Sequence, residues 1–337
     1  MKKTVSFSRH ATNVFFHILT ACNLKCRHCY INPREHGTAT LPIDTIDSWL
    51  AFFAKKNPHA NVIFLGGEPT LHPDLPHAIK TARALGYESI TVDTNGYLFH
   101  DFLHNVAPAE IDYLSFSLDG ATRETNDAIR GQGCYDTCLA GIKEAVAKGF
   151  STSLIFTVSR LNWHELDRMV PLVRQLGIER FFIQVVGIRG NSAEAKDDGP
   201  NDLQLTREEW EDLVPPVAEK AADAGLIVTY PKVFLDHGDS FSCAGLVADN
   251  YFIFPNGRVY RCPLCEDFPL HSFTFEGDQL VATAKINEID LFQLTIPEGC
   301  VMNKLIQPDN LRYDGHHHPQ YKIACCLLKE TITPDSV

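Results

Sequence analysis

Short apolar runs alternate with amphipathic stretches along the first half of the chain. The apolar runs are rich in β-branched residues and predict strands at residues 14–19, 62–65, 89–92, 113–118, 152–158 and 180–186. The amphipathic stretches predict helices at residues 46–54, 75–85, 136–148 and 166–176. Apolar strands that alternate with helices are typical of a parallel sheet covered by helices. Six such units are too few to close an eight-stranded barrel, so we expect an α/β fold with a partial (β/α)6 TIM-type barrel.

The pattern changes after the sixth predicted strand. Residues 187–204 are polar and form a long loop, which is either a lid over a site or a surface insertion. Thr206 and Glu209 have the spacing of a capping box and predict a helix that ends near Ala224. Beyond Val228 the helical periodicity weakens and cysteines become frequent. We therefore expect a barrel domain over residues 1–230 and a small cysteine-rich domain over residues 231–337.

The composition is that of a globular protein, since 45% of the residues are hydrophobic and 21% are charged. The formal net charge of −12 disfavours a nucleic-acid partner, because binding a polyanion requires a basic surface. The N-terminus lacks the apolar segment of a signal peptide, and no apolar run approaches the roughly 18 residues that cross a bilayer. We expect a cytoplasmic protein that binds neither nucleic acid nor a membrane.

The chain contains 11 cysteines, which in a reducing compartment are expected to be free thiols or metal ligands. Cys22, Cys26 and Cys29 form a C-x3-C-x2-C loop directly after the first predicted strand. Three thiolates at this spacing can ligate three irons of a cubane cluster and leave the fourth iron open to a substrate or cofactor. A structural zinc site with His28 as the fourth ligand is the alternative.

The cysteine loop, followed by Tyr30, resembles the CxxxCxxC signature of the radical SAM superfamily. As in that family, further short motifs follow the next three predicted strands, and an arginine motif comes after them. These motifs are Gly66-Gly67-Glu68-Pro69, Thr94-Asn95-Gly96, Ser117-Leu118-Asp119-Gly120 and Arg130-Gly131. The resemblance extends over about residues 15–187.

The resemblance implies a [4Fe-4S] cluster on the three cysteines and S-adenosylmethionine at its open iron. The residues implied to contact S-adenosylmethionine are Gly66, Gly67 and Glu68 near its amino group, and Thr94, Asn95, Ser117, Asp119 and Arg130 near its ribose and carboxylate. The glycines would allow the ligand to approach the backbone closely. The alternatives are that Glu68 is an exposed loop carboxylate and that Asp119 only caps a turn.

A second cysteine group lies in the last third of the chain. Aromatic and β-branched residues around Asn256-Gly257 predict a hairpin, with Cys243 before it and Cys262 after it. Thirteen residues separate Cys243 from Gly257 and four separate Gly257 from Cys262, which resembles the C-x9-15-G-x4-C opening of SPASM and Twitch domains. These domains hold auxiliary iron–sulfur clusters.

The continuation C-x2-C-x5-C-x3-C of a full SPASM domain is absent, so we expect a single auxiliary [4Fe-4S] cluster. Its predicted ligands are Cys243, Cys262, Cys265 and Cys326. Cys300 and Cys325 are the alternatives for completing the set, and a zinc ion is the alternative occupant. Cys134 and Cys138 are expected to be core thiols.

The resemblance implies that the reduced cluster donates one electron to S-adenosylmethionine, methionine leaves, and a 5′-deoxyadenosyl radical abstracts a substrate hydrogen. The electron donor would be a flavodoxin or a ferredoxin, and the auxiliary cluster would assist electron transfer or substrate binding. Peptide modification of the RiPP type is the commonest role for family members with such a tail. The first predicted strand begins by about Val14, which leaves no room for an N-terminal leader-recognition domain, so modification of a small metabolite is the alternative. A zinc-binding scaffold protein is the alternative of a different class.

Overall fold

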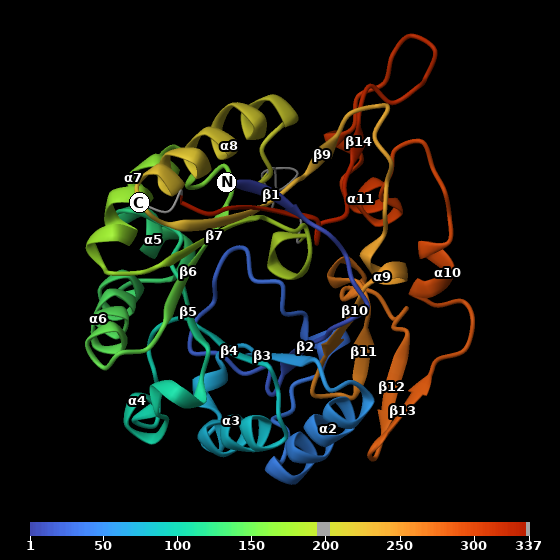
Figure 1. The fold of residues 1–337 in the computed structure, drawn as a ribbon. Helices are drawn as coiled ribbons and strands as arrows, with labels where there is room; N and C mark the ends of the chain where they lie inside the picture. The colour runs from blue at the N-terminus through green and yellow to red at the C-terminus, as the bar shows by residue number, and fades with distance from the viewer. Residues whose placement is uncertain (194–202, 335–337) are drawn as a thin grey trace.

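The computed structural model describes residues 1–193 and 203–334. Parallel strands form the wall of an open barrel and pair in chain order (Figure 1). They are β2 (Thr12–His17), β3 (Ala60–Leu65), β4 (Ser89–Thr94), β5 (Tyr113–Ser117), β6 (Thr152–Val158) and β7 (Arg180–Val185). Each overlaps one of the predicted strands, so the partial barrel predicted from the sequence is confirmed.

Helices cover the outside of this wall (Figure 1). The longer ones are α2 (Ile43–Lys56), α3 (Leu75–Ala84), α6 (Cys134–Ala147), α7 (Leu166–Gln175) and α8 (Arg207–Asp223). Shorter helices elsewhere in the described chain are α1 (Pro33–His36), α4 (Phe102–Asn105), α5 (Arg123–Arg130), α9 (Ala244–Val247), α10 (Glu288–Phe292) and α11 (Val301–Ile306). The predicted capping box begins α8, because the Thr206 hydroxyl accepts from the Glu209 amide at 3.2 Å and the Glu209 carboxylate accepts from the Thr206 amide at 2.7 Å.

Both edges of the sheet are extended by further strands, and within the described residues the sheet has 13 strands. Apart from the β10–β11 hairpin, the sequence pattern did not predict these edge strands. On one edge lie β8 (Ile227–Pro231), β15 (Lys329–Ile332) and β1 (Lys2–Val5); on the other lie β10 (Asp249–Ile253), β11 (Arg258–Tyr260), β12 (Phe273–Glu276) and β13 (Gln279–Ala282). A separate pair is formed by β9 (Phe234–Leu235) and β14 (Lys322–Ile323). The boundary expected between residues 230 and 231 falls within β8, before its last residue, and the chain beyond it joins both edges of the barrel sheet.

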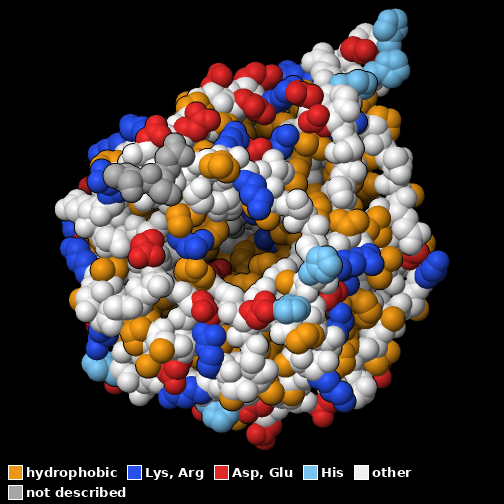
Figure 2. Space-filling model, in the orientation of Figure 1, with side chains coloured by type: hydrophobic (Ala, Val, Ile, Leu, Met, Phe, Trp, Pro, Cys, Tyr) orange, Lys and Arg blue, Asp and Glu red, His pale blue; other side chains and the backbone are white. Residues whose placement is uncertain are grey.

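Strand alternation gives the sheet an apolar outer face and a mixed inner face. Phe16 is fully buried and its ring contacts Trp49 of α2, whereas the neighbouring Phe15 points to the opposite face and stacks on Phe252. On that inner face Asn13 donates to Asn250 at 2.9 Å. Figure 2 shows the molecule hollowed at the centre of the ring of strands, with hydrophobic, basic and acidic side chains around the hollow.

The predicted hairpin around Asn256 and Gly257 is formed by β10 and β11, which pair antiparallel. Gly257 adopts a φ of +84°, a conformation in which glycine avoids the clash of a side chain. Because β10 also pairs in parallel with β2, the hairpin is fixed beside the strand that leads into the first cysteine loop. None of the described helices is long and apolar enough to cross a membrane.

Candidate active site

The first three cysteines lie in a loop that leaves the carboxyl end of β2. The loop is held against the next strand connection by backbone hydrogen bonds from Gly67 to the Leu19 carbonyl at 3.1 Å and from Glu68 to the Ala21 carbonyl at 3.0 Å. Cys22 is exposed, whereas Cys26 and Cys29 are half-buried. The structure therefore places the three thiols together at the end of the barrel where the βα loops of such folds form active sites.

The raised pKa values of these thiols show that their thiolate forms need a positive charge nearby. Burial, with a smaller contribution from the charge of Cys29, raises the pKa of Cys22 to about 11 and that of Cys26 to about 12. Arg130 acts in the opposite direction on each pKa. The chain alone thus keeps the thiols protonated, and bound iron would supply the positive charge that favours thiolates. The donor set suits an iron–sulfur cluster on Cys22, Cys26 and Cys29.

Gly66 and Gly67 are required by the cysteine loop itself. A Cβ atom on Gly66 would lie 2.7 Å from the Leu19 carbonyl oxygen, and one on Gly67 would lie 2.2 Å from the Ala21 carbonyl oxygen. The family resemblance predicts that these glycines make room for a ligand. The contact that the structure shows is with the backbone that leads into Cys22.

Glu68 is 1% exposed and joins two of the loops. Its Oε1 accepts from the Thr70 amide at 3.1 Å, the Thr70 hydroxyl at 2.6 Å and the Thr94 hydroxyl at 2.8 Å, and its Oε2 accepts from the Asn95 amide at 2.7 Å. Burial raises the pKa of Glu68, and these hydrogen bonds oppose the rise. Glu68 is therefore no exposed loop carboxylate, and only Oε2 retains capacity for a further donor such as an ammonium group.

Asn95 connects the β4 loop to the cysteine loop. Its Nδ2 donates to Asn23 Oδ1 at 2.8 Å and lies 3.9 Å from Cys22 Sγ. Its own Oδ1 accepts from the Tyr97 amide at 3.2 Å, which fixes the side-chain orientation. Thr94 and Asn95, both predicted from the motif, thus lie beside Glu68 and Cys22.

Asp119 forms a buried charge cluster at the end of β5. Its Oδ2 lies 2.7 Å from Arg130 Nε and 3.1 Å from His28 Nε2, and its Oδ1 accepts from the Thr157 amide at 2.7 Å. Burial would raise the pKa of Asp119, but Arg130 and then His28 outweigh it and hold the pKa at about 2. Asp119 is thus ionised and paired rather than a simple turn cap, and His28 points to Asp119.

Two more of the singled-out residues lie near this cluster. The Arg130 carbonyl faces Cys26 Sγ at 3.9 Å, so the end of α5 contacts the cysteine loop. Ser117 is half-buried on β5, and its carbonyl accepts from the Cys138 thiol at 3.7 Å. Cys134 and Cys138 are themselves buried, as expected for core thiols.

Residues 189–191, after β7, hold the cysteine loop, a role that no motif in the sequence indicated. The Asn191 amide donates to the Cys29 carbonyl at 2.8 Å, and Asn191 Nδ2 donates to the Cys26 carbonyl at 3.0 Å. This segment belongs to the polar loop predicted over residues 187–204, of which residues 194–202 lie outside the described residues. Its position at the carboxyl end of a barrel strand was the one signal in the sequence that pointed to it.

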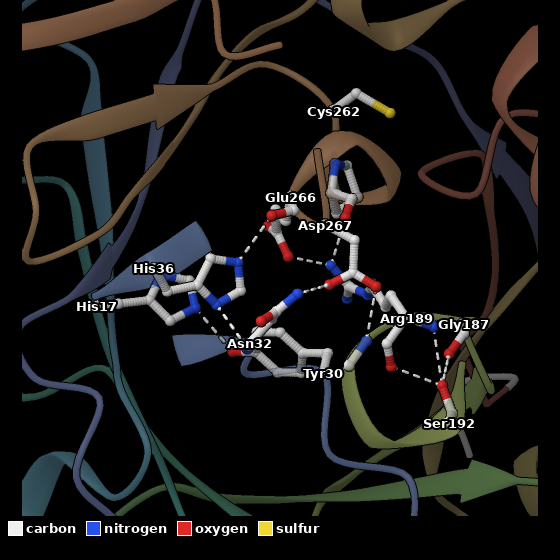
Figure 3. A network of polar contacts seen from close by, with 12 residues as sticks. His17, Tyr30, Asn32, His36, Gly187, Arg189, Ser192, Cys262, Glu266 and Asp267 are labelled. Carbon is white, nitrogen blue, oxygen red and sulfur yellow. Dashed lines mark hydrogen bonds and ion pairs between the residues drawn. The ribbon is translucent and has the colours of Figure 1, made fainter. Parts of the chain in front are cut away.

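Arg189 links the first cysteine loop to the second cysteine group (Figure 3). Its guanidinium lies 4.5 Å from the centre of the Tyr30 ring and forms an ion pair with Glu266. Beside it, Asp267 accepts from the Gly190 amide at 2.7 Å. Tyr30 directly follows Cys29, and Glu266 directly follows Cys265, so this network holds the two cysteine groups in a fixed relation.

The second cysteine group surrounds one cavity. Five thiols line it, those of Cys243, Cys262, Cys300, Cys325 and Cys326. Cys265 is fully buried, and its thiol interacts with that of Cys262. The structure thus gathers both the predicted ligands and the two alternatives. Among the described residues no three His, Cys, Asp or Glu side chains are arranged to hold a single metal ion.

Comparisons with known proteins bear on both halves of the chain. Residues 17–173 match the family model described as the Radical SAM superfamily. A probable GTP 3′,8-cyclase of Saccharolobus solfataricus is 31% identical over 178 residues, which are 52% of this chain and 58% of that protein. The pre-heme d1 synthase of Dinoroseobacter shibae is 32% identical over 221 residues, which are 63% of this chain and 52% of that protein. The chain thus spans little more than half the length of these curated relatives.

Two solved structures share the fold over most of the chain. Streptococcus suis SuiB bound to its precursor peptide SuiA superposes with a TM-score of 0.70 at 16% identity, covering 88% of this chain and 73% of that one. Native anSMEcpe with bound AdoMet superposes with a TM-score of 0.60 at 13% identity, covering 88% of this chain and 82% of that one. At such identities the likeness establishes the partial-barrel fold.

Proposed function

We propose that this chain, which belongs to the radical SAM superfamily through its domain at residues 17–173, holds a [4Fe-4S] cluster on Cys22, Cys26 and Cys29 and cleaves S-adenosylmethionine. When bound, the cluster and S-adenosylmethionine supply one-electron reductive cleavage and, from it, abstraction of a hydrogen atom from the substrate. The observation that carries the proposal is the convergence of three strand-end motifs on the cysteine loop: Glu68 at Ala21, Asn95 at Cys22, and the Asp119–Arg130 pair at His28 and Cys26.

The chain's own residues orient the ligands and exclude water. Glu68 Oε2 would receive the ammonium group of S-adenosylmethionine beside Gly66 and Gly67. The ribose and carboxylate of S-adenosylmethionine would be contacted by Thr94, Asn95 and Ser117. The ion pair of Asp119 and Arg130 would hold its two charges in a fixed position beside them. Because the pair is buried, its electrostatic effect is less screened than that of a surface pair.

We favour a peptide as the substrate. The matches to the curated relatives cover 52% and 63% of this chain, including the part that carries the common chemistry. The superposition on SuiB extends over 88% of the chain and includes the C-terminal part, and SuiB was solved with its precursor peptide. A small metabolite is the second candidate, because the sequence relatives are named as GTP 3′,8-cyclase and pre-heme d1 synthase.

For residues 231–337 we propose an auxiliary [4Fe-4S] cluster held by Cys243, Cys262, Cys265 and Cys326. The support is the single cavity around which the cysteines gather and the Arg189 network that fixes it relative to Cys29. The cluster would accept an electron from the substrate or bind it, and a flavodoxin or ferredoxin would reduce the first cluster.

The test is reductive cleavage of S-adenosylmethionine by the anaerobically reconstituted chain, measured as 5′-deoxyadenosine formed with dithionite. Alanine at Cys22, Cys26 or Cys29 should abolish the product while far-ultraviolet circular dichroism stays unchanged. Cys134→Ala, a buried cysteine outside both groups, is the matched control. Cleavage that persists in the triple alanine variant would refute the assignment.

The substrate class can be separated by isotope tracing. The chain is incubated with the peptide fraction or the small-molecule fraction of a deuterated cell extract, and deuterium is sought in 5′-deoxyadenosine. Deuterium from the peptide fraction alone supports the favoured substrate class. Deuterium from the small-molecule fraction alone supports the second candidate.

A further inference from the structure

Lys329 occupies the inner wall of the barrel immediately after the second cysteine group. It is the first residue of β15, which pairs with β8 so that Lys329 lies opposite Pro231, the last residue of β8. Because β8 runs parallel to β7, this end of β15 lies at the carboxyl end of the barrel strands. Ile332 belongs to the apolar core on the outer side, so the half-buried Lys329 faces the inner side.

The charge of Lys329 has no carboxylate partner in the described part of the chain. Its ammonium group donates to Gln184 Oε1 at 3.0 Å, across the width of β8. By contrast, the buried Arg130 and the half-buried Arg189 near the candidate site are each paired, Arg130 with Asp119 and Arg189 with Glu266. Burial of an unpaired cation is unfavourable, and an anionic ligand would offset that cost.

Gln184 adds a second hydrogen-bond donor, its NH₂ group, beside the ammonium group of Lys329. A lysine ammonium can only donate, so the oxygen of the Gln184 amide must face Lys329 and its NH₂ group must face away. Ile183 is buried in the outer core, which places Gln184 on the inner face of β7. The free hydrogens of the ammonium and the amide therefore lie together on the inner face of the sheet.

We propose that Lys329 and Gln184 bind a carboxylate group of the substrate at the inner wall of the barrel. The proposal deepens the proposed function and rests on it. One positive charge and one neutral donor match a carboxylate, which has a single negative charge shared by two acceptor oxygens. A phosphate carries about 1.5 to 2 negative charges near neutral pH and would be left undercompensated by one lysine.

A competing role for Lys329 is to compensate the thiolates of Cys325 and Cys326. Burial lowers the pKa of Lys329, and these two cysteines raise it. A substitution of Lys329 distinguishes carboxylate binding from charge compensation, because each role predicts a different change. A ligand site affects the binding of carboxylates, whereas charge compensation affects the potential of the auxiliary cluster.

The experiment uses the full chain, reconstituted with iron and sulfide and saturated with S-adenosylmethionine. Trifluoroacetate serves as the carboxylate probe, and its binding is measured by ¹⁹F NMR line broadening. Lys329→Met removes the cation, and Gln184→Glu builds a carboxylate into the chain that would pair with Lys329. Each substitution should weaken binding of trifluoroacetate by roughly tenfold, the loss typical of a charge-assisted hydrogen bond. Lys3→Met, at an exposed position on the neighbouring β1, should bind like the unsubstituted chain.

Acetate should compete with trifluoroacetate better than inorganic phosphate does. Equal broadening in Lys329→Met and the unsubstituted chain would overturn the proposal, as would stronger competition by phosphate. An altered midpoint potential of the auxiliary cluster with intact trifluoroacetate binding would overturn it in favour of charge compensation. Cleavage of S-adenosylmethionine by the unsubstituted chain, measured on the same preparation, tests the proposed function separately.

Discussion

At the scale of single residues, Glu68 shows that a position predicted to contact a ligand also organises the chain around it. The family resemblance implies that Glu68 is a partner for a ligand ammonium group. In the structure three of its four hydrogen bonds converge on Oε1, from Thr70 and Thr94, and its principal contacts are therefore with the chain itself. A carboxylate is suited to this position because it only accepts, and every neighbour here donates.

Glu68→Gln tests whether the hydrogen bonds accepted by the Glu68 carboxylate organise the site. The amide NH₂ group must face at least one donor, so one hydrogen bond is lost and a buried donor is left unpaired, at a cost of about 1–3 kcal/mol. We expect a lower unfolding midpoint and weaker binding of S-adenosylmethionine in isothermal titration calorimetry. Glu88→Gln, at an exposed glutamate, is the control. Unchanged stability and affinity in Glu68→Gln would show that the hydrogen bonds do not organise the site.

At the scale of elements, the segment after β7 should be essential for the position of the cysteine loop. A Cβ atom on Gly190 would lie 2.5 Å from the Cys29 carbonyl oxygen, and the φ of Gly190 is +55°. Gly190→Ala therefore forces the segment away from the loop and also strains the backbone. Gly149→Ala is a matched control, because Gly149 has a φ of +83° but no atom within 4 Å of the Cβ that alanine would add.

We expect Gly149→Ala to lower stability by about 1 kcal/mol, the typical cost of a strained backbone position, and to leave the iron content unchanged. Gly190→Ala should lower stability further and should lose irons of the first cluster during gel filtration. Iron content and unfolding midpoints of the two variants check this. Equal behaviour of the two would show that the contact with Cys29 is unimportant.

A stack of three rings joins β2, α1 and the β10–β11 hairpin. Phe254 lies between His17 and His36, at centroid distances of 4.1 and 3.8 Å. Burial lowers the pKa of His17 and of His36 to about 3, from the usual histidine value of 6.5. Between these two pH values the unfolded chain binds protons that the folded chain does not, so stability falls as the pH falls.

His36→Gln should remove the contribution of one histidine. From pH 6.5 to pH 5 that contribution is about 2 kcal/mol, since one pKa unit corresponds to about 1.4 kcal/mol. The unfolding free energy from urea titrations at pH 7.5 and pH 5.0 should therefore differ less in His36→Gln than in the unsubstituted chain. His316→Gln, at an exposed position, is the control. An equal pH response in both variants would contradict the role of His36.

The elements that the sequence predicted are those whose pattern is local. The strand at residues 152–158 was predicted with its observed ends because six of its seven residues are apolar or β-branched. β1 and β15 were missed because each has only four residues, with charged side chains among them, and their pairing joins positions more than 300 residues apart. Short strands of this kind depend on tertiary pairing more than on propensity.

At the scale of the whole molecule, the residues of the candidate site also fall into two groups, those that a local motif predicts and those that only the fold brings together. Cys22, Glu68, Asn95 and Asp119 were found because each belongs to a short motif at a strand end. The contacts of Arg189 and Lys329 were not found, because their partners Glu266 and Gln184 are 77 and 145 residues away. A single chain gives no local pattern for such pairs, and only the fold brings them together.

The second cysteine group is also assembled by the whole fold. Cys243 precedes α9, Cys262 and Cys265 follow β11, Cys300 precedes α11, and Cys325 and Cys326 precede β15. With two cubane clusters, the reconstituted chain should contain about eight irons. Cys243→Ala or Cys262→Ala should reduce this to about four, because the ligands of the first cluster are all on one separate loop.

Cys265→Ala and Cys326→Ala should lose the same four irons, whereas Cys300→Ala and Cys325→Ala should retain about eight. The reason is geometric: adjacent residues such as Cys325 and Cys326 seldom direct both side chains at one cluster, so one of the two is expected to be a spectator. Iron and zinc are counted by mass spectrometry of the metals, with Cys134→Ala as the control. About four irons and one zinc in the unsubstituted chain would replace the auxiliary cluster by a zinc site. Loss of iron in Cys300→Ala but not in Cys326→Ala would instead change only the fourth ligand, because the cavity that Cys243 and Cys262 line would still hold the cluster.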